Sequence, residues 1–308
     1  MQLRIHTEPS ERGAPYATVL RAARAAEELG FDAFFRSDHY LQVGADAEEP
    51  GPSDAWLTLA ALARDTRRVR LGTLVSPATF RSPGQLAIQV AQVDDMSGGR
   101  AELGLGAGWF EAEHEAYAIP YPGKRFARLE EQLRIVRGLW TTGRAERFDF
   151  EGEHFRLVGA QPTLAPVQRP HPPIIVGGTG AVRTPALAAA YADEYNAAFV
   201  SPEQAGIQYD RIRKALAENG RGEDSMRFSV IQTVCCGRTD AELRRREQAL
   251  REPLPEHAFR GTPDRIADLI GQYERAGADR VYLRTLDLTD LDHLELVADR
   301  VLPQCAPA

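Results

Sequence analysis

The chain has 308 residues, of which 43% are hydrophobic and 26% charged, and its formal net charge is −7 at pH 7. This balance is typical of a globular protein and argues against non-specific nucleic-acid binding, which needs a basic surface. Three cysteines (Cys235, Cys236, Cys305) make no disulfide framework, and neither a secretory signal nor an apolar run of about 20 residues is present. We therefore expect a cytoplasmic protein without a membrane or nucleic-acid partner.

Short apolar segments alternate with helical ones along the chain. Gly30 follows the first helical segment, as glycine often does at a helix end, and Ser53 is expected to cap the second helix. Thr262 and Pro263 form a typical helix start. Strands are expected at 3–7, 31–39, 69–75, 101–107, 174–176, 195–200, 227–234 and 280–283. Helices are expected at 16–29, 54–66, 84–96, 125–140, 183–191, 203–218, 239–251, 263–276 and 290–301.

Eight strands that alternate with helices favour a closed α/β TIM barrel, (β/α)₈, over an open doubly wound sheet. No composition shift splits the chain, so residues 1–308 are expected to form one domain. RFDFEGEHFRL, at about 147–157, predicts a hairpin inserted on this scaffold, and about 235–262 predicts a loop insertion. An acidic loop (45–52), a Pro-rich connector (162–173) and a Pro-broken loop (252–260) complete the pattern.

In parallel α/β folds, the loops after the carboxyl ends of the strands carry the site. Ser37, Asp38 and His39 end the second expected strand, and a histidine there can exchange a proton near neutral pH. The alternative is that Asp38 caps a turn and His39 packs in the core. The stretches 74–81 and 106–114 are the other places where chemistry is expected.

Two glycine clusters follow expected strands. Gly177, Gly178, Thr179 and Gly180 precede a helix, so their N–H groups could hold a phosphate, with Arg183 and Thr184 nearby; an ordinary tight turn is the alternative. Gly104, Gly106 and Gly108 alternate along the fourth strand and would let a flat ligand approach the backbone. Trp109 would then wall the pocket, unless it is simply a packed aromatic residue.

An acidic stretch follows Trp109. Glu111, Glu113, His114 and Glu115 invite a metal interpretation, but their spacing matches no standard zinc motif. An acidic helix start with a solvated face is the favoured interpretation, and no metal is expected. The adjacent Cys235 and Cys236 lie within an expected strand and are interpreted as structural.

Four stretches, taken together, carry a family resemblance. They are FDAFFRSDHY (31–40), LGTLVSPATFRSPGQLAIQVAQVDDMSGGRAELGLGAGWFEAEHEAYAIPYP (71–122), PPIIVGGTG with RT and ADEYN (172–196), and GTPDRIADLIGQYERAGADRVYL (261–283). They resemble the luciferase-like monooxygenase superfamily, and most closely its bacterial branch that depends on the deazaflavin coenzyme F420. The resemblance implies a TIM barrel with insertions, commonly a homodimer, whose cofactor lies at the carboxyl end of the barrel.

The resemblance also implies roles for individual residues. Asp38 and His39 would lie near the deazaflavin ring, with His39 in the proton-handling or substrate-orienting role. A non-proline cis peptide at Leu74–Val75 would form a bulge behind the ring. The remaining cofactor contacts, including those to its phosphate and acidic tail, would come from Gly106, Ala107, Gly108, Trp109, Gly177, Gly178, Thr179 and Arg183.

One departure limits the substrate. Trp109 stands where the deazaflavin-dependent sugar-phosphate dehydrogenases of this superfamily place a glutamate proton donor, and their sugar-phosphate lysines have no match here. This argues against a sugar-phosphate substrate. The sequence thus favours an F420-dependent oxidoreductase that transfers a hydride between C5 of the deazaflavin and a small organic substrate. The alternatives are an FMN-dependent monooxygenase with a partner flavin reductase, and a non-catalytic flavin-fold binding protein.

Overall fold

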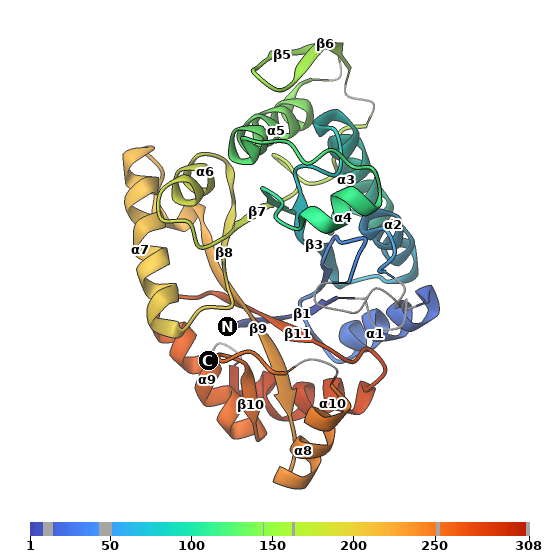
Figure 1. The fold of residues 1–308 in the computed structure, drawn as a ribbon, viewed down its shortest axis with the longest axis vertical. Helices are drawn as coiled ribbons and strands as arrows, with labels where there is room; N and C mark the ends of the chain where they lie inside the picture. The colour runs from blue at the N-terminus through green and yellow to red at the C-terminus, as the bar shows by residue number, and fades with distance from the viewer. Residues whose placement is uncertain (9–14, 43–50, 144, 162–163, 251–252, 306–308) are drawn as a thin grey trace.

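A closed barrel of eight parallel strands forms the centre of the molecule (Figure 1). The computed structural model describes residues 1–8, 15–42, 51–143, 145–161, 164–250 and 253–305. The barrel strands are β1 (Gln2–Thr7), β2 (Ala33–Arg36), β3 (Arg70–Pro77), β4 (Ala101–Gly106), β7 (Ile174–Gly177), β8 (Glu194–Ala198), β9 (Arg227–Cys236) and β11 (Arg280–Thr285).

The strand pairing confirms the predicted barrel and excludes the open doubly wound sheet. Each strand pairs in parallel with its neighbour in the order β9-β11-β1-β2-β3-β4-β7-β8. The ring closes because β8 also pairs with β9, from Glu194 opposite Arg227 to Ala198 opposite Ile231. An open sheet would leave those two edges unpaired.

Helices between the strands cover the outside of the barrel. They are α1 (Tyr16–Glu28), α2 (Ala55–Asp65), α3 (Pro83–Ser97), α5 (Arg125–Thr141), α6 (Arg183–Tyr191), α7 (Pro202–Glu218), α8 (Asp240–Ala249), α9 (Pro263–Arg275), α10 (Leu291–Arg300) and the short α11 (Leu302–Cys305). Thr262 caps α9 as predicted, since its hydroxyl accepts the N–H of Arg265. None of these helices combines the length and apolarity that crossing a lipid bilayer requires.

The predicted cap of α2 is wrong by one residue. The carboxylate of Asp54, and not the hydroxyl of Ser53, accepts the backbone N–H of Leu57 (2.8 Å), which makes Asp54 the N-cap. Ser53 instead accepts hydrogen bonds from Arg36, through its hydroxyl and its carbonyl oxygen. Both residue types are good caps, so local sequence could not distinguish them.

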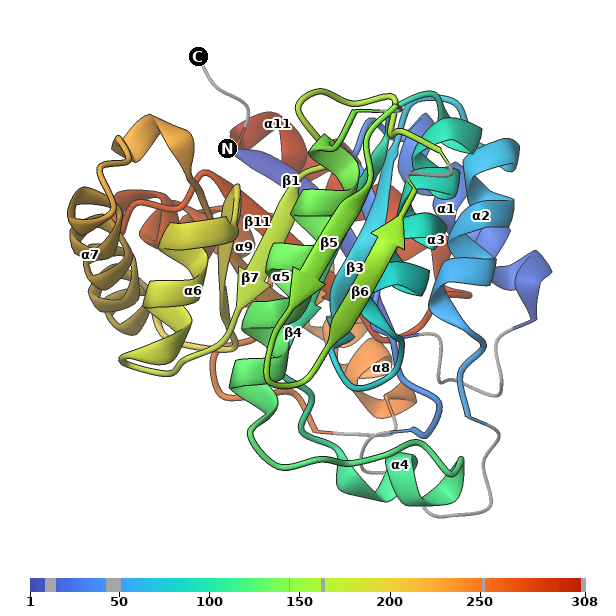
Figure 2. The same cartoon turned by 90° about the horizontal axis from the view of Figure 1, so that it is seen from above.

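The insertions lie outside this regular pattern. The predicted hairpin is present as β5 (Phe148–Glu151) and β6 (Arg156–Ala160), which pair antiparallel. The predicted loop insertion carries α8 and a short strand, β10 (Phe259–Gly261), that pairs with β9. A 3-10 helix (Glu223–Ser225, η2) precedes β9, and α4 (Glu111–Ala116) lies apart from the ring of helices (Figure 2). Residues 45–50 of the acidic loop, 162–163 of the connector and 252 of the Pro-broken loop are outside the described residues.

The two halves of the barrel interior differ in chemistry. Near the amino ends of the strands, Arg4 donates to Glu102 (Nη1 to Oε2, 2.7 Å), and Tyr282 donates to Glu194 (2.8 Å); all four side chains are buried. Above them lie apolar side chains that include Phe35, Leu74, Ile175 and Ile231. This filled lower half leaves the carboxyl ends of the strands as the place where the barrel opens.

Candidate active site

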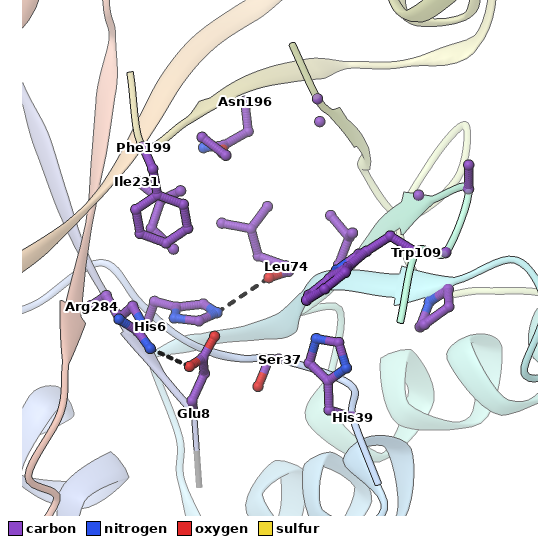
Figure 3. Close-up of a pocket in the computed structure, with 18 of the residues that line it drawn as sticks. His6, Glu8, Ser37, His39, Leu74, Trp109, Asn196, Phe199, Ile231 and Arg284 are labelled. Carbon is purple, nitrogen blue, oxygen red and sulfur yellow. Dashed lines mark hydrogen bonds and ion pairs between the residues drawn. The ribbon is translucent and has the colours of Figure 1, made fainter. Parts of the chain in front are cut away.

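A cavity of about 680 Å³ opens at the carboxyl ends of the barrel strands (Figure 3). This volume lies in the range of small-molecule and cofactor sites, about 300–1,000 Å³. The residues that line it are His6, Glu8, Ser37, His39, Leu74, Val75, Pro77, Gly106, Ala107, Gly108, Trp109, Glu113, Arg125, Phe126, Gly177, Gly178, Asn196, Ala198, Phe199, Ile231, Pro253, Pro255 and Arg284.

Most of the residues predicted for the site meet in this cavity. The strand ends bring together nine of them from four strands: His39, Leu74, Val75, Gly106, Ala107, Gly108, Trp109, Gly177 and Gly178. Three predicted residues do not line it, namely Asp38, Thr179 and Arg183. Thr179 and Arg183 are exposed, and Arg183 lies over the ring of Phe126, 5.8 Å from its centroid, so they belong to the surface beyond the cavity.

Strand β3 carries the predicted bulge. The Leu74–Val75 peptide is cis, and the pairing with β4 shifts register between Thr73 and Ser76. Leu74 and Val75 both line the cavity. The imidazole of His6 reaches this bulge from β1, and its Nε2–H donates to the carbonyl oxygen of Leu74 (3.2 Å). The location predicted from the resemblance is therefore confirmed.

Glycine is required in and just after β4 for a different reason from the predicted one. A Cβ on Gly104 would overlap the carbonyl oxygen of Thr73, and a Cβ on Gly106 would lie 2.8 Å from Cγ2 of Val75. Gly108 has a φ of +80°, which favours glycine. These glycines are needed by the bulge of β3 and by the backbone. A flat ligand is not required to explain Gly104 and Gly106, although Gly106 and Gly108 do line the cavity.

His39 is held by a carboxylate. Its Nδ1–H donates to Oε1 of Glu113 (3.0 Å), and Oε2 of Glu113 accepts the backbone N–H of Tyr40 (3.0 Å). Burial lowers the pKa of His39, but the hydrogen bond and charge of Glu113 outweigh it, so the net pKa is raised. With Nδ1 committed to Glu113, Nε2 is the ring nitrogen that remains for proton exchange.

The solvated face predicted for the acidic stretch is wrong for two of its residues. The stretch does form a helix, α4, but Glu113 and His114 are each 1% exposed. His114 donates from Nδ1 to the carbonyl of Phe110 (2.7 Å) and accepts the hydroxyl of Thr79 at Nε2 (2.7 Å). Polar partners in the neighbouring loops bury both side chains, and such distant partners leave no local sequence signal. Glu111 and Glu115 are exposed as expected.

Asp38 does not face the cavity, which corrects its predicted contact with the cofactor. Its carboxylate is buried against Arg81 (Oδ2 to Nη1, 2.5 Å) and accepts the hydroxyl of Ser76 (2.6 Å). Successive side chains of an extended segment point to opposite sides, so Asp38 and His39 cannot both face the cavity. Asp38 thus anchors the end of β2 to the loop after β3 while His39 points inward.

A second polar group lines the cavity wall beside His39, on the side of β1 and β11 (Figure 3). His6 and Glu8 come from the end of β1 and Arg284 from β11, and Arg284 forms an ion pair with Glu8. Burial lowers the pKa of His6 to about 4. Sequence reasoning missed all three residues. The available signal was their position at the carboxyl ends of the first and eighth strands, where polar side chains are otherwise unexpected in a buried strand.

Two other features bear on chemistry. Burial raises the pKa of Cys235 to about 11 and of Cys236 to about 12, so neither is an activated nucleophile. Within the described ranges, no group of three or more His, Cys, Asp or Glu side chains is placed to hold a metal ion.

Comparison with known proteins shows the family of this chain, and the names of its relatives include two kinds of cofactor. The family model described as luciferase-like monooxygenase matches residues 1–279. F420-dependent glucose-6-phosphate dehydrogenase from Nocardia farcinica is 34% identical over 231 residues, which cover 71% of this chain and 64% of that protein. FMNH2-dependent dimethylsulfone monooxygenase from Pseudomonas putida is 28% identical over 261 residues, which cover 84% of this chain and 67% of that protein.

The chain thus spans about two thirds of the length of these relatives. Among solved structures, the coenzyme F420-dependent tetrahydromethanopterin reductase from Methanopyrus kandleri has a TM-score of 0.82 and covers 99% of both chains, at 18% identity. This likeness shows the fold, a TIM barrel. The named relatives are oxidoreductases or monooxygenases that use F420 or FMN. On the match over residues 1–279, the chain belongs to the luciferase-like monooxygenase family.

Proposed function

We propose that this chain is a coenzyme F420-dependent oxidoreductase that transfers a hydride between C5 of the deazaflavin and a small organic substrate. The observation that carries the proposal is the His39–Glu113 pair. It places a proton-exchanging nitrogen in the wall of a cavity whose lining also includes the β3 bulge and many apolar side chains. A hydride transfer to or from a carbon–oxygen group needs such a proton donor or acceptor.

The residues of the cavity fit a flat tricyclic cofactor with a phosphate. The bulge at Leu74 and Val75 would back the ring, and Gly106 and Ala107 would line its edge. Gly177 and Gly178 would hold the phosphate, and Gly178 has a φ of +131°, which turns the loop toward the start of α6. Val182, the N-cap residue of α6, makes no side-chain hydrogen bond to the first turn, and the N–H groups there are suited to an anion.

Two arginines extend this phosphate side. Arg125 lines the cavity from α5, where Nε donates to the carbonyl of Gly108 (3.2 Å), and Arg183 lies on the surface at the start of α6. Their charges would suit the acidic tail of coenzyme F420, which extends beyond the phosphate. Arg183 would therefore contact the acidic tail of the cofactor outside the cavity, and not the part of the cofactor that lies inside it.

The bound cofactor would supply the hydride chemistry. His39 would hold or release the paired proton at Nε2, while Glu113 keeps Nδ1 protonated and the ring fixed. Trp109 stacks on Phe110 and meets His39 edge-on, with ring centroids 6.1 Å apart, so it would limit the access of water to this side of the cavity. Asp38 would act through its ion pair with Arg81, as a positioning residue.

The choice of F420 over FMN is supported by the resemblance of several joint motifs and by relatives named for F420. Two relatives named F420-dependent glucose-6-phosphate dehydrogenase, from Amycolatopsis mediterranei and Nocardia farcinica, are 31% and 34% identical to this chain. The FMNH2-dependent monooxygenase is 28% identical. The latter aligns over the larger share of this chain, which favours an FMN-dependent monooxygenase as the second candidate function. A deazaflavin lacks the nitrogen at position 5 and activates oxygen poorly, so cofactor preference separates the two functions.

The test is a pair of fluorescence titrations of the apo-protein, one with coenzyme F420 and one with FMN. We expect F420 to bind at least about tenfold more tightly, which corresponds to about 1.4 kcal/mol. A tenfold preference for FMN would contradict the proposal and support the monooxygenase. Failure of both to bind would contradict both functions and favour the non-catalytic alternative.

A further inference from the structure

The ion pair between Glu8 and Arg284 lies in the wall of the cavity, and Glu8 lies between Arg284 and His39 (Figure 3). Arg284 comes from β11 and also donates from Nη1 to the hydroxyl of Thr233 (3.2 Å). Its side chain is 10% exposed and that of Glu8 is 24% exposed. Burial raises the pKa of Glu8, but the charge of Arg284 outweighs it and keeps the carboxyl ionised.

An arginine at this position would ordinarily attract an anion. A guanidinium binds phosphate or carboxylate through two parallel hydrogen bonds, and it does so more strongly in a partly buried site. Here Glu8 already supplies a carboxylate to Nη2 of Arg284. An anionic substrate would have to displace Glu8 and then remain beside it, which like-charge repulsion disfavours.

The other charged groups of the wall are also engaged. His39 is paired with Glu113. Arg125 donates to the carbonyl oxygens of Gly108 and Pro122 and keeps its charge, but it lies on the side assigned above to the phosphate and tail of the cofactor. His6 donates its Nε2–H to Leu74. Apolar side chains make up much of the rest of the wall, from Trp109, Phe126, Phe199, Ile231, Pro253 and Pro255.

We propose that the substrate is an uncharged organic molecule with an apolar body and one hydroxyl or carbonyl oxygen, and that Glu8 is the residue that excludes anionic substrates. The oxygen would meet Nε2 of His39, and that part rests on the proposed function. The exclusion of anions rests on the Glu8–Arg284 pair alone and does not depend on which cofactor binds.

The exclusion is tested with inorganic phosphate on the full chain, by calorimetric titration. The variants are Glu8→Gln, the double variant Glu8→Gln/Arg284→Gln, and Glu247→Gln as a matched control. Glu247 pairs with Arg260 outside the cavity, and its side chain is 22% exposed, close to the value for Glu8. Phosphate held at Gly177 and Gly178 would be common to all variants, so the difference between variants reports on Arg284.

We expect Glu8→Gln to bind phosphate at least about tenfold more tightly than the wild type, a difference of about 1.4 kcal/mol. The gain should vanish in the double variant and be absent in Glu247→Gln. Equal binding by the wild type and Glu8→Gln, whether tight or weak, would overturn the proposal. So would a gain that survives the loss of Arg284.

A second measurement needs no variant and remains decisive if Glu8→Gln does not fold. Cyclohexanone and the same ring carrying a 4-carboxylate are titrated into the wild-type chain, and quenching of tryptophan fluorescence is followed, since Trp109 lines the cavity. The neutral ketone should bind at least about tenfold more tightly. Equal or tighter binding of the carboxylate would overturn the proposal. Neither result depends on the F420 and FMN titrations, so the two proposals can fail separately.

Discussion

Nδ1 of His39 lies 3.0 Å from Oε1 of Glu113, although the two residues are 74 positions apart in the chain. His39 follows β2, and Glu113 lies on α4. The same carboxylate accepts the backbone N–H of Tyr40. One side chain therefore fixes both the tautomer of the histidine and the path of the chain that leaves β2. The tautomer of His39, which follows β2, is therefore fixed by a residue of α4, a helix that follows β4.

We expect Glu113→Gln to lower the pKa of His39, because burial would then act without the compensating carboxylate. A histidine with a raised pKa adds stability that is fully present below its unfolded pKa of about 6.5 and is lost as the pH rises through the folded pKa. The variant should lose this dependence. The activity profile against pH should shift to lower pH, with kcat reduced about tenfold or more.

The His39 pKa is measured from the NMR titration of its ring protons, beside the pH profile of kcat. Glu115→Gln is the matched control, because Glu115 is exposed on the same helix. It should leave both measurements unchanged. A Glu113→Gln enzyme with the wild-type His39 pKa would show that the carboxylate does not govern the imidazole.

Asp38→Asn should reduce stability much more than activity. The change removes one of the two carboxylates that pair with the buried guanidinium of Arg81, the other being Asp54, and loss of a partner from a buried ion pair costs up to about 3 kcal/mol. His39→Asn should show the reverse, with a large loss of kcat and a small loss of stability. The free energy of unfolding in urea is measured for both variants, and kcat is measured at a temperature where both are folded. A hundredfold loss of kcat in folded Asp38→Asn, of the order that loss of a general acid or base causes, would restore the catalytic role predicted for it.

The barrel and much of its cavity wall could be predicted from the sequence, because periodicity and strand-end position are local signals. His39, Val75 and Gly177 lie at or close to strand ends, which follow from where apolar runs stop. The bulge at Leu74 and Val75 followed from a family resemblance and not from periodicity.

The partners of the site residues could not be predicted in the same way. Glu113 looked like a solvated helix start, since nothing near it in the sequence announces His39. Glu8 and Arg284 are neighbours only because β1 and β11 are adjacent when the barrel closes, with His6 opposite Arg284 in the register. The resemblance implies that Asp38 and His39 both lie near the deazaflavin ring, but the alternation of an extended segment sends Asp38 to the other side.

Two glycines of β4 should respond differently to replacement by alanine, because a Cβ would meet backbone at Gly104 and a side chain at Gly106. In Gly104→Ala the new Cβ would overlap the carbonyl oxygen of Thr73, which the strand pairing holds in place. In Gly106→Ala it would press on the side chain of Val75, which can move toward the cavity. We expect Gly104→Ala to destabilise the fold strongly, and Gly106→Ala to weaken cofactor binding with a smaller loss of stability.

Thermal unfolding and the cofactor titration are carried out on both variants. Gly84→Ala is the control, because a Cβ on this glycine of α3 meets nothing within 4 Å. It should leave both quantities near the wild-type values or slightly raise stability. A Gly106→Ala chain with unchanged cofactor affinity would mean that Val75 does not contact the bound ring.

The buried polar layer below the cavity is formed by Arg4, Glu102, Tyr282 and Glu194. It predicts how the free energy of unfolding changes at acid pH. Glu102 is buried, which raises its pKa, but Arg4 and Arg70 outweigh burial and hold the pKa well below the ordinary range. A lowered carboxyl pKa adds stability that is present above the unfolded pKa of about 4.3 and is lost as the pH falls through the folded pKa. Glu102→Gln should therefore be about 3 kcal/mol less stable at neutral pH, since Arg4 is left buried without this partner.

The difference between Glu102→Gln and the wild type should shrink as the pH falls below about 4.3, because the unfolded wild type then takes up a proton at Glu102, and the loss is complete once the pH falls through the lowered pKa of the folded state. Urea unfolding at a series of pH values measures it. Glu153→Gln is the control: this residue pairs with Lys124 on the exposed surface, where solvent screening makes an ion pair worth little, so its loss should change the pH dependence only slightly. If the Glu102→Gln difference stays constant down to low pH, the layer stabilises the barrel through packing and hydrogen bonds, and the charge of Glu102 adds nothing.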